Sequence, residues 1–355
     1  MEPIIIAQTA WWQNILLGIL VIGLLVCPLT IRWVESRLEL FLLAVGVAAV
    51  TVSGEWSFSL LHHALQAPVN VAFIVLVVSV IFNNYSRYIF RILFGLFRKL
   101  EPRYSFAALV FLLGMTSSVV SVTVSALLLA EVLKVVKLEH SAMVRITVFA
   151  CYAIALGAIL TPMAEPMGLV IKSALSGPPH RADFFFLLRH FWAWIMPAVV
   201  LLSVAAGYCA RRAGAGLQMY IREDKETYSS VLRRTWHIYV FVGALFLIST
   251  GLRPLAQQIV TQLGGKILFL ANALSVIIDN ATLAAIEIVP TISQTDLVYM
   301  VIGLVAFGSM LVQGNLPNIV AAEKLDIKSR EWAGVAVPTG FVLISVYFLL
   351  LTILL

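Results

Sequence analysis

Charged residues are scarce in this sequence, and their scarcity excludes a soluble fold. Of its 355 residues only 12% are charged, while 61% are hydrophobic; soluble domains carry roughly 25% charged residues. So few charges cannot cover this much apolar surface in water. The apolar runs are long and continuous, and helices satisfy their own backbone groups inside a bilayer. We therefore expect an all-α polytopic membrane protein.

Signatures of catalysis and of metal binding are also missing. The cysteines Cys27, Cys151 and Cys209 lie singly in apolar runs, so the chain has no paired-cysteine motif and no transition-metal site is expected. No phosphate-binding loop and no His-Glu-x-x-His sequence is present. The first fourteen residues contain neither Lys nor Arg, so the basic region of a signal peptide is absent. We expect no enzyme, no cofactor and an uncleaved first span.

Basic residues are confined to short connections between the apolar runs. The formal net charge is +6, but this distribution is typical of membrane topology and does not indicate a nucleic-acid partner. Lys and Arg are concentrated at 85–104, 211–236 and 323–331, which predicts that these stretches are cytoplasmic. All three stretches lie on one side of the membrane only if the segments 105–137 and 264–291 each enter and leave the membrane on the same side. We therefore predict two re-entrant hairpins, with both termini outside the cell membrane.

This topology divides the chain into N-terminal scaffold spans followed by two repeats, which are called the first and second halves below. Residues 1–104 are predicted as N-terminal scaffold spans, at 14–31, 38–53 and 69–93, and 211–236 as a cytoplasmic linker. The predicted parts of the two halves are as follows: repeat 1 (105–210) has hairpin 105–137, broken helix 141–175 and span 191–210; repeat 2 (237–355) has span 237–255, hairpin 264–291, broken helix 295–322 and span 332–354.

An internal repeat supports this division. "SSVVSVTVSALL" (117–128) matches "LSVIIDNATLAA" (274–285) at an offset of 157 residues. "GAILTPMAEPMGLVI" (157–171) matches "GSMLVQGNLPNIVAA" (308–322) at an offset of 151. Few residues are identical, but both matches keep the same order of a polar-tipped hairpin and a proline-broken helix. Because the two halves start from opposite sides of the membrane, we predict an inverted-repeat transporter fold.

Polar residues gather at the predicted hairpin turns and helix breaks. Asp279 would lie at mid-membrane, where a carboxylate costs roughly 2.5–3.5 kcal/mol; a buried, protonated structural Asp is the alternative. Pro162 and Pro166 remove backbone donors around Glu165. Alternatively, Lys172 could form an ion pair with Glu165 across the broken stretch, which would give Glu165 a structural role. The candidate ion- or substrate-binding residues are Ser118, Ser121, Thr123, Ser125, Thr161, Glu165, Asn272, Ser275, Asp279, Asn280, Thr282, Gln313, Asn315 and Asn318.

At these residues the chain resembles the ion transporter superfamily, which includes NhaD-type sodium/proton antiporters, arsenite pump membrane subunits and divalent-anion symporters. The resemblance covers about 100–330 and is closest to a small family of candidate cation transporters. The matching stretches are "SVIIDNATLAA", "LTPMAEPMGLVI", "LVQGNLPNIVAAEKLDI" and "KSREWAGVAVPTG". The resemblance implies two ion sites, each between a hairpin tip and a broken helix, elevator-type movement and a homodimer in the bilayer. The sequence departs from the symporters at Ser121-Val122-Thr123, and from the antiporters because only one hairpin carries an Asp.

Secondary transport of a cation is the leading hypothesis, with Na⁺/H⁺ antiport as its form. Glu165 and Asp279 would alternate between a proton and Na⁺. A Na⁺-coupled symporter of a small anion is the alternative, although no Arg lies at the centre of the predicted site. Glu131 lies near Lys134 on the returning limb of the first hairpin and is interpreted as a surface residue. An intramembrane protease is less favoured, because no Gly-x-Gly-Asp signature is present.

Overall fold

The computed structural model describes most of the chain as helices. The described residues are 10–31, 33–34, 37–66, 68–69, 72–73, 76–77, 80, 84, 101–136, 138–162, 164–212, 228–260, 265–277, 280–288 and 291–355. The predicted scaffold span at 69–93 therefore lies largely outside them. The helices are α1 (Trp11–Thr30), α3 (Leu38–Ser53), α5 (Pro102–Val120), α6 (Val122–Val135), α7 (His140–Ala158), α8 (Pro166–Ala174), α9 (Phe186–Arg212), α10 (Tyr228–Val260), α11 (Gly265–Ala271), η1 (Asn272–Val276), α12 (Asn280–Glu287), α13 (Gln294–Gly308), η2 (Val312–Gly314), α14 (Leu316–Leu325) and α15 (Ser329–Leu354).

Six of the described helices are long and apolar enough to cross a membrane: α1, α5, α7, α9, α10 and α15. Their outer faces carry large apolar side chains. On α15, for example, Phe341, Val342 and Ile353 are each at least 60% exposed. An apolar surface of this extent suits contact with lipid and not with water. The all-helical membrane class predicted from composition is confirmed at this level.

Two helices, α7 and α13, form the centre of the molecule. In α7 all nine residues from Ala150 to Ala158 are buried, and in α13 the same is true from Leu297 to Gly308. Helices α5, α9 and α15 pack against α7, while α11 and α15 pack against α13. The two central helices also contact each other. A helix that is apolar all round is buried on every side, as these two are.

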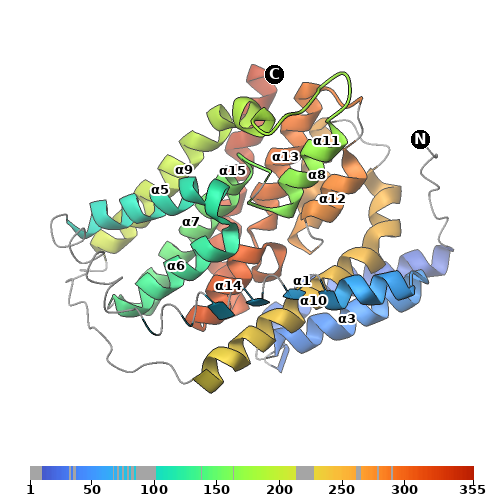
Figure 1. Ribbon diagram of the computed structural model, residues 1–355, viewed down its shortest axis with the longest axis horizontal. Coiled ribbons are helices and arrows are strands. Elements are labelled where there is room, and N and C mark those ends of the chain that lie inside the picture. Colours follow the sequence, from blue (N-terminus) through green and yellow to red (C-terminus); the bar gives the residue numbers. More distant parts are fainter. Residues whose placement is uncertain are drawn as a thin grey trace.

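Some of the helix contacts in one half have a counterpart in the other. In the first half α5 packs on α7, and in the second half α11 packs on α13. The short helix α8, which follows α7, packs against α12 of the other half. In the same manner α14, which follows α13, packs against α6. Figure 1 places α14 near the lower edge of the molecule and α8 in its upper part.

A layer made of α1 and α3 from the N-terminal part of the chain, together with α10, lies beside this centre (Figure 1). Helix α10 packs along α3, and α1 packs on α3 as well. The crossing depends on small residues: a Cβ on Gly251 would lie 2.5 Å from the backbone carbon of Ala49. Small residues let membrane helices approach closely, so this glycine fixes the distance between α3 and α10.

Both central helices are followed by an interruption and a short helix that begins with proline. Pro166 is the first residue of α8, and Pro317 is the second residue of α14. Proline suits the first turn of a helix because its missing N–H has no partner there in any case. The interruptions lie where the sequence predicts them. The prolines, however, start the second helix instead of breaking a continuous one.

Helix lengths differ from the prediction in two places. Residues 228–236, predicted as the end of a cytoplasmic linker, form the first turns of α10; the amphipathic sequence continues the helix beyond its apolar part. The rest of that linker, 213–227, lies outside the described residues. The limb α5 has 19 residues and is long enough by itself to cross a membrane, so length alone does not identify it as half of a hairpin.

Candidate functional site

The first candidate site lies where the α5–α6 connection meets the interruption after α7. Only Ser121 separates α5 from α6, and its φ of 117° belongs to a region that L residues rarely adopt. The Ser117 hydroxyl donates to the Ile154 carbonyl at 2.9 Å. The Thr161 hydroxyl donates to the carbonyl oxygen of Ser118. These two bonds join the end of α5 to α7 and to the interruption, which is the pairing predicted for the first half.

Glu165 is the acidic group of this interruption. It is 7% exposed and directly precedes α8. The positive end of a helix dipole favours a carboxylate at that position. The chain folds back tightly here, because a Cβ on Gly168 would lie 2.9 Å from the Thr161 carbonyl oxygen. Glu165 and Thr161 therefore belong to one buried polar turn.

The remaining residues of the first hairpin surround the same connection. Thr123 and Ser125 are buried on α6, while Ser121 is half-buried. The Ser118 hydroxyl bonds back to the Met115 carbonyl at 2.7 Å, within its own helix. The Ser125 hydroxyl has no hydrogen-bond partner among the described residues. The Ser125 hydroxyl is thus a buried polar group without a partner among these residues, whereas the Ser118 backbone carbonyl accepts one bond from Thr161.

The second candidate site joins η1 and α12 to α13. The Asn272 side-chain amide donates to the Met300 carbonyl at 3.0 Å, and the Ser275 hydroxyl donates to the Leu304 carbonyl at 3.0 Å. The Asn280 amide packs against the last residue of α13, since a Cβ on Gly308 would lie 2.7 Å from its Oδ1. These three predicted residues are buried and lie together.

The interruption after α13 contains the other predicted amide side chains, and these do not all face the same part of the molecule. The Asn318 amide donates to the Leu311 carbonyl at 3.0 Å and so closes the interruption on itself. Asn315 is buried at the start of α14, and its Nδ2 has no partner among the described residues. Gln313 instead reaches the Leu24 carbonyl of α1 at 3.4 Å. The Gln313 side-chain amide therefore faces a scaffold helix, while η2, which contains Gln313, packs against η1 of the second half.

Two predicted residues cannot be placed in full. Asp279 lies outside the described residues. Thr282 belongs to α12, but its side chain lies outside them as well. Both stay predictions. Among the described residues no group of three His, Cys, Asp or Glu side chains could hold a metal ion.

A buried ion pair was missed from the sequence. Glu131, interpreted as a surface residue, accepts from Lys324 at 2.6 Å, and the Lys324 side chain is 1% exposed. The surface interpretation of Glu131 is therefore wrong. Lys324 also lies within α14 and not in a cytoplasmic loop from 323 onward, because α14 continues to Leu325. The pair joins α6 to the short helix α14.

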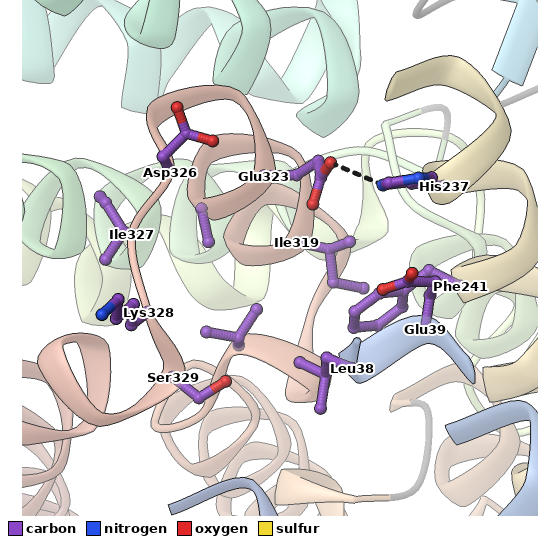
Figure 2. A pocket seen from close by; sticks show the side chains of 12 residues that line it. Leu38, Glu39, His237, Phe241, Ile319, Glu323, Asp326, Ile327, Lys328 and Ser329 are labelled. Carbon is purple, nitrogen blue, oxygen red and sulfur yellow. Dashed lines mark hydrogen bonds and ion pairs between the residues drawn. The ribbon is translucent and has the colours of Figure 1, made fainter. Parts of the chain in front are cut away.

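Two cavities lie at different places in the fold. One, of about 310 Å³, lies between α3, α10, α14 and α15 and reaches Val312 of the second interruption. Figure 2 shows its acidic lining, in which Glu323 faces His237; their atoms Oε1 and Nδ1 are 3.2 Å apart. The other, of about 550 Å³, lies between the α8–α9 loop and the start of α13 and is lined by His180, Arg189 and His190 among others.

Comparison with known proteins gives a family match along nearly the whole chain. A family model described as "Protein of unknown function (DUF1646)" matches residues 14–354. No curated protein matches the chain.

Proposed function

Since the chain belongs to the protein family DUF1646, which is described as of unknown function, we propose its function from the structure: secondary active transport of a cation, with Na⁺/H⁺ antiport as the activity. One observation carries the proposal. In each half, a buried polar connection meets an interruption inside an apolar helix that is surrounded by protein. Non-helical backbone at membrane depth is tolerated where it is buried in protein or lines a cavity. Ion sites of secondary transporters are built in this way.

The proposal includes an inverted repeat, and the packing supports it. Exchanging the halves converts the α8–α12 contact into the α14–α6 contact, and the α5–α7 contact into the α11–α13 contact. Two hydrogen bonds lie within one residue of the same correspondence. Ser117 donates to a carbonyl three residues before Gly157, and Ser275 donates to one four residues before Gly308. Contacts that recur in this manner are expected of two related halves and would be a coincidence otherwise.

The alternating-access part of the proposal draws on the two cavities. Inverted-repeat transporters open a central site to one side and then to the other by moving one group of helices against the rest. The cavity that reaches Val312 and the cavity at His180 lie at different places in the fold. We place the hairpins and interrupted helices in the moving group and α1, α3 and α10 in the scaffold. A homodimer in the cell membrane, with both termini outside, completes this arrangement.

Glu165 and Asp279 are proposed as the groups that exchange Na⁺ for a proton. Glu165 is buried in the first interruption, and in the sequence Asp279 directly precedes Asn280, the first residue of α12. Carboxylate, hydroxyl and amide oxygens are hard ligands of the kind that small cations prefer. The resemblance to NhaD-type antiporters favours the same assignment. The central sites as predicted hold amides and hydroxyls but no Arg, which favours a cation over an anion.

Exchange in proteoliposomes tests the proposal. The purified full-length protein is reconstituted with a pH-sensitive dye inside, and Na⁺, Li⁺, K⁺ or Ca²⁺ is added outside over a range of pH. We expect the interior pH to rise when Na⁺ or Li⁺ is added to the outside of acid-loaded vesicles. No response to any of the cations, in vesicles that contain folded protein, would overturn the proposed antiport.

A further inference from the structure

Two consecutive residues of α14 pair with helices on different sides of it. The Glu323 carboxylate lies 3.2 Å from His237 of α10, measured from Oε1 to Nδ1. The next residue, Lys324, pairs with Glu131 of α6 at 2.6 Å. Helix α14 therefore lies between α6 and α10 and packs against both. The proposed function places α6 and α14 in the moving group and α10 in the scaffold, so the pair of His237 and Glu323 crosses the boundary between them.

The two pairs differ in their access to water. The side chains of Lys324 and Glu131 are 1% and 15% exposed, so protein encloses that pair. The side chains of His237 and Glu323 are 38% and 36% exposed. A proton from solvent therefore reaches His237 without any opening of the fold, and the charge of this pair follows the pH of the surrounding water.

The boundary between α10 and α14 is only partly packed. A small apolar cluster that includes Leu127, Ile238 and Val320 joins α6, α10 and α14 there, separate from the main core. Beside His237, between the same two helices, lies the cavity of about 310 Å³ (Figure 2). Protein interiors usually contain few voids larger than a water molecule. With so small an apolar contact, an ion pair contributes a substantial part of what holds α14 against α10.

This contact is an ion pair only while His237 is protonated. A carboxylate oxygen accepts hydrogen bonds, so Nδ1 of His237 carries the proton that it donates to Glu323. Protonation of Nε2 then adds the positive charge, and its loss leaves a hydrogen bond from a neutral ring. Histidine is the side chain whose charge ordinarily changes between about pH 5 and pH 8. Carboxylates normally stay ionised throughout that range.

The other charged groups around His237 are mostly acidic. The cavity is also lined by Glu39 of α3 and by Asp326 and Lys328 of the connection between α14 and α15. Helices α1, α11 and α12 contact α10 as well, but they contribute no described residue to this lining. With Glu323, the lining has more carboxylates than ammonium groups. Protonation of His237 therefore brings the local charge closer to balance.

We propose that the pair of His237 and Glu323 is a pH-sensitive latch, which holds α14 against α10 while His237 is protonated and releases it when His237 is neutral. Its stabilisation is complete at acid pH, where the imidazolium faces an ionised carboxylate, and it is lost as the pH rises and the ring gives up its proton. Both residues adjoin stretches predicted as cytoplasmic, 211–236 and 323–331, so the latch responds to cytoplasmic pH. Only the statement that release of α14 speeds transport rests on the proposed function.

Hydrogen–deuterium exchange of the full-length protein in detergent tests the latch without transport. Exchange of the α14 backbone amides is compared at about pH 5.5 and about pH 8, which lie on either side of the ordinary histidine transition, after correction for the intrinsic pH dependence of amide exchange. In the wild type we expect about two- to fivefold greater protection at the lower pH, the effect of one partly exposed ion pair. His237→Gln and Glu323→Gln should each remove this difference, and the double variant should behave like either single variant.

His63→Gln is the matched control. The Nδ1 atom of His63 bonds to the Ser59 carbonyl one turn earlier in the chain, at 2.7 Å, so this histidine binds a neutral acceptor in its own segment. The variant removes a titrating histidine and leaves the latch intact. Its α14 amides should keep the pH dependence of the wild type.

The proteoliposome assay then relates the latch to transport. At about pH 5.5 His237→Gln should exchange about two- to fivefold faster than the wild type, and at about pH 8 the two should be equal. Equal α14 protection at both pH values in the wild type, or a pH difference that persists in both Gln variants, would overturn the latch. Unchanged exchange in a variant whose α14 is released would overturn its role in transport. A working latch in a protein without exchange activity would overturn the proposed function and retain the latch.

Discussion

The Cα atom of Gly157, near the end of α7, faces the carbonyl oxygen of Gly114 in α5 so closely that a side chain cannot fit between them. A Cβ on Gly157 would lie 1.7 Å from that oxygen. We expect Gly157→Ala to push α5 away from α7 and to destabilise the protein by about 3 kcal/mol, the upper part of the usual range for overpacking. Loss of the Ser117–Ile154 hydrogen bond would follow. Thermal unfolding in detergent measures the effect.

Gly18→Ala serves as the control for that substitution. A Cβ at Gly18 in α1 would meet nothing within 4 Å. Alanine is also the better helix former by about 1 kcal/mol. Gly18→Ala should therefore leave the melting temperature equal or slightly higher. A Gly157→Ala variant as stable as Gly18→Ala would contradict the close packing of α5 on α7.

The buried ion pair predicts a non-additive double substitution. Lys324→Met leaves Glu131 without its partner, and breaking a buried pair costs about 3–5 kcal/mol. Adding Glu131→Gln removes the uncompensated charge and should recover most of that loss. Thermal unfolding of the two single variants and the double variant gives the coupling.

An exposed ion pair provides the comparison. Arg189 and Asp183 are 2.7 Å apart, with side chains that are more than half exposed. The Arg189 guanidinium donates a hydrogen bond to Asp183 and holds the pKa of that carboxyl below its usual value. Solvent screens this pair, so Arg189→Gln should hardly change the melting temperature near neutral pH. Equal effects of Lys324→Met and Arg189→Gln would mean that Lys324 is not buried against Glu131.

The proposed transport depends on the two carboxylates assigned to the exchange of Na⁺ for a proton. Glu165→Gln and Asp279→Asn remove one negative charge each with little change of shape. We expect each to reduce Na⁺-driven proton movement to the level of protein-free liposomes, because neither amide binds a proton or replaces the carboxylate charge. Asp183→Asn, on an exposed loop, should exchange like the wild type. Full activity of a folded Asp279→Asn variant would remove Asp279 from the mechanism.

Local sequence signals predicted the helix class, the interruptions and the polar residues near them. The predicted span at 38–53 coincides with α3, because its apolar run ends at Gly54, whose φ of 76° suits a helix C-cap. Pro166 and Pro317 were predicted to break continuous helices; the interruptions are there, but the prolines lie in the first turn of the short helices that follow. Such features depend on residues that are adjacent in the chain, so they can be predicted from the local sequence.

Contacts between distant segments were not predictable from local signals. Glu131 seemed exposed because a basic residue, Lys134, follows it on a limb that ends at the membrane surface. Its real partner, Lys324, belongs to the other half of the chain. Gln313 was grouped with its neighbours, but its amide faces α1. One signal was available in the internal repeat. By its offsets, Glu131 and Lys324 correspond to positions within one residue of Glu287 and Lys172. Charged residues that recur at equivalent positions inside membrane segments are costly enough to indicate that they contact a partner.

Removing the Thr161 hydroxyl tests whether this group has only a structural role in the first site or also binds the ion. It donates to the Ser118 carbonyl and so ties the end of α5 to the interruption. Thr161→Val keeps the shape and removes the hydroxyl; we expect it to cost about 1 kcal/mol, the net value of one hydrogen bond. If the oxygen also binds Na⁺, the concentration of Na⁺ at half-maximal exchange should rise several-fold as well. Thr250→Val is the control, because the Thr250 hydroxyl bonds to the Phe246 carbonyl in its own helix. That variant should change stability slightly and the Na⁺ dependence not at all, so equal Na⁺ dependence in both variants would restrict Thr161 to a structural role.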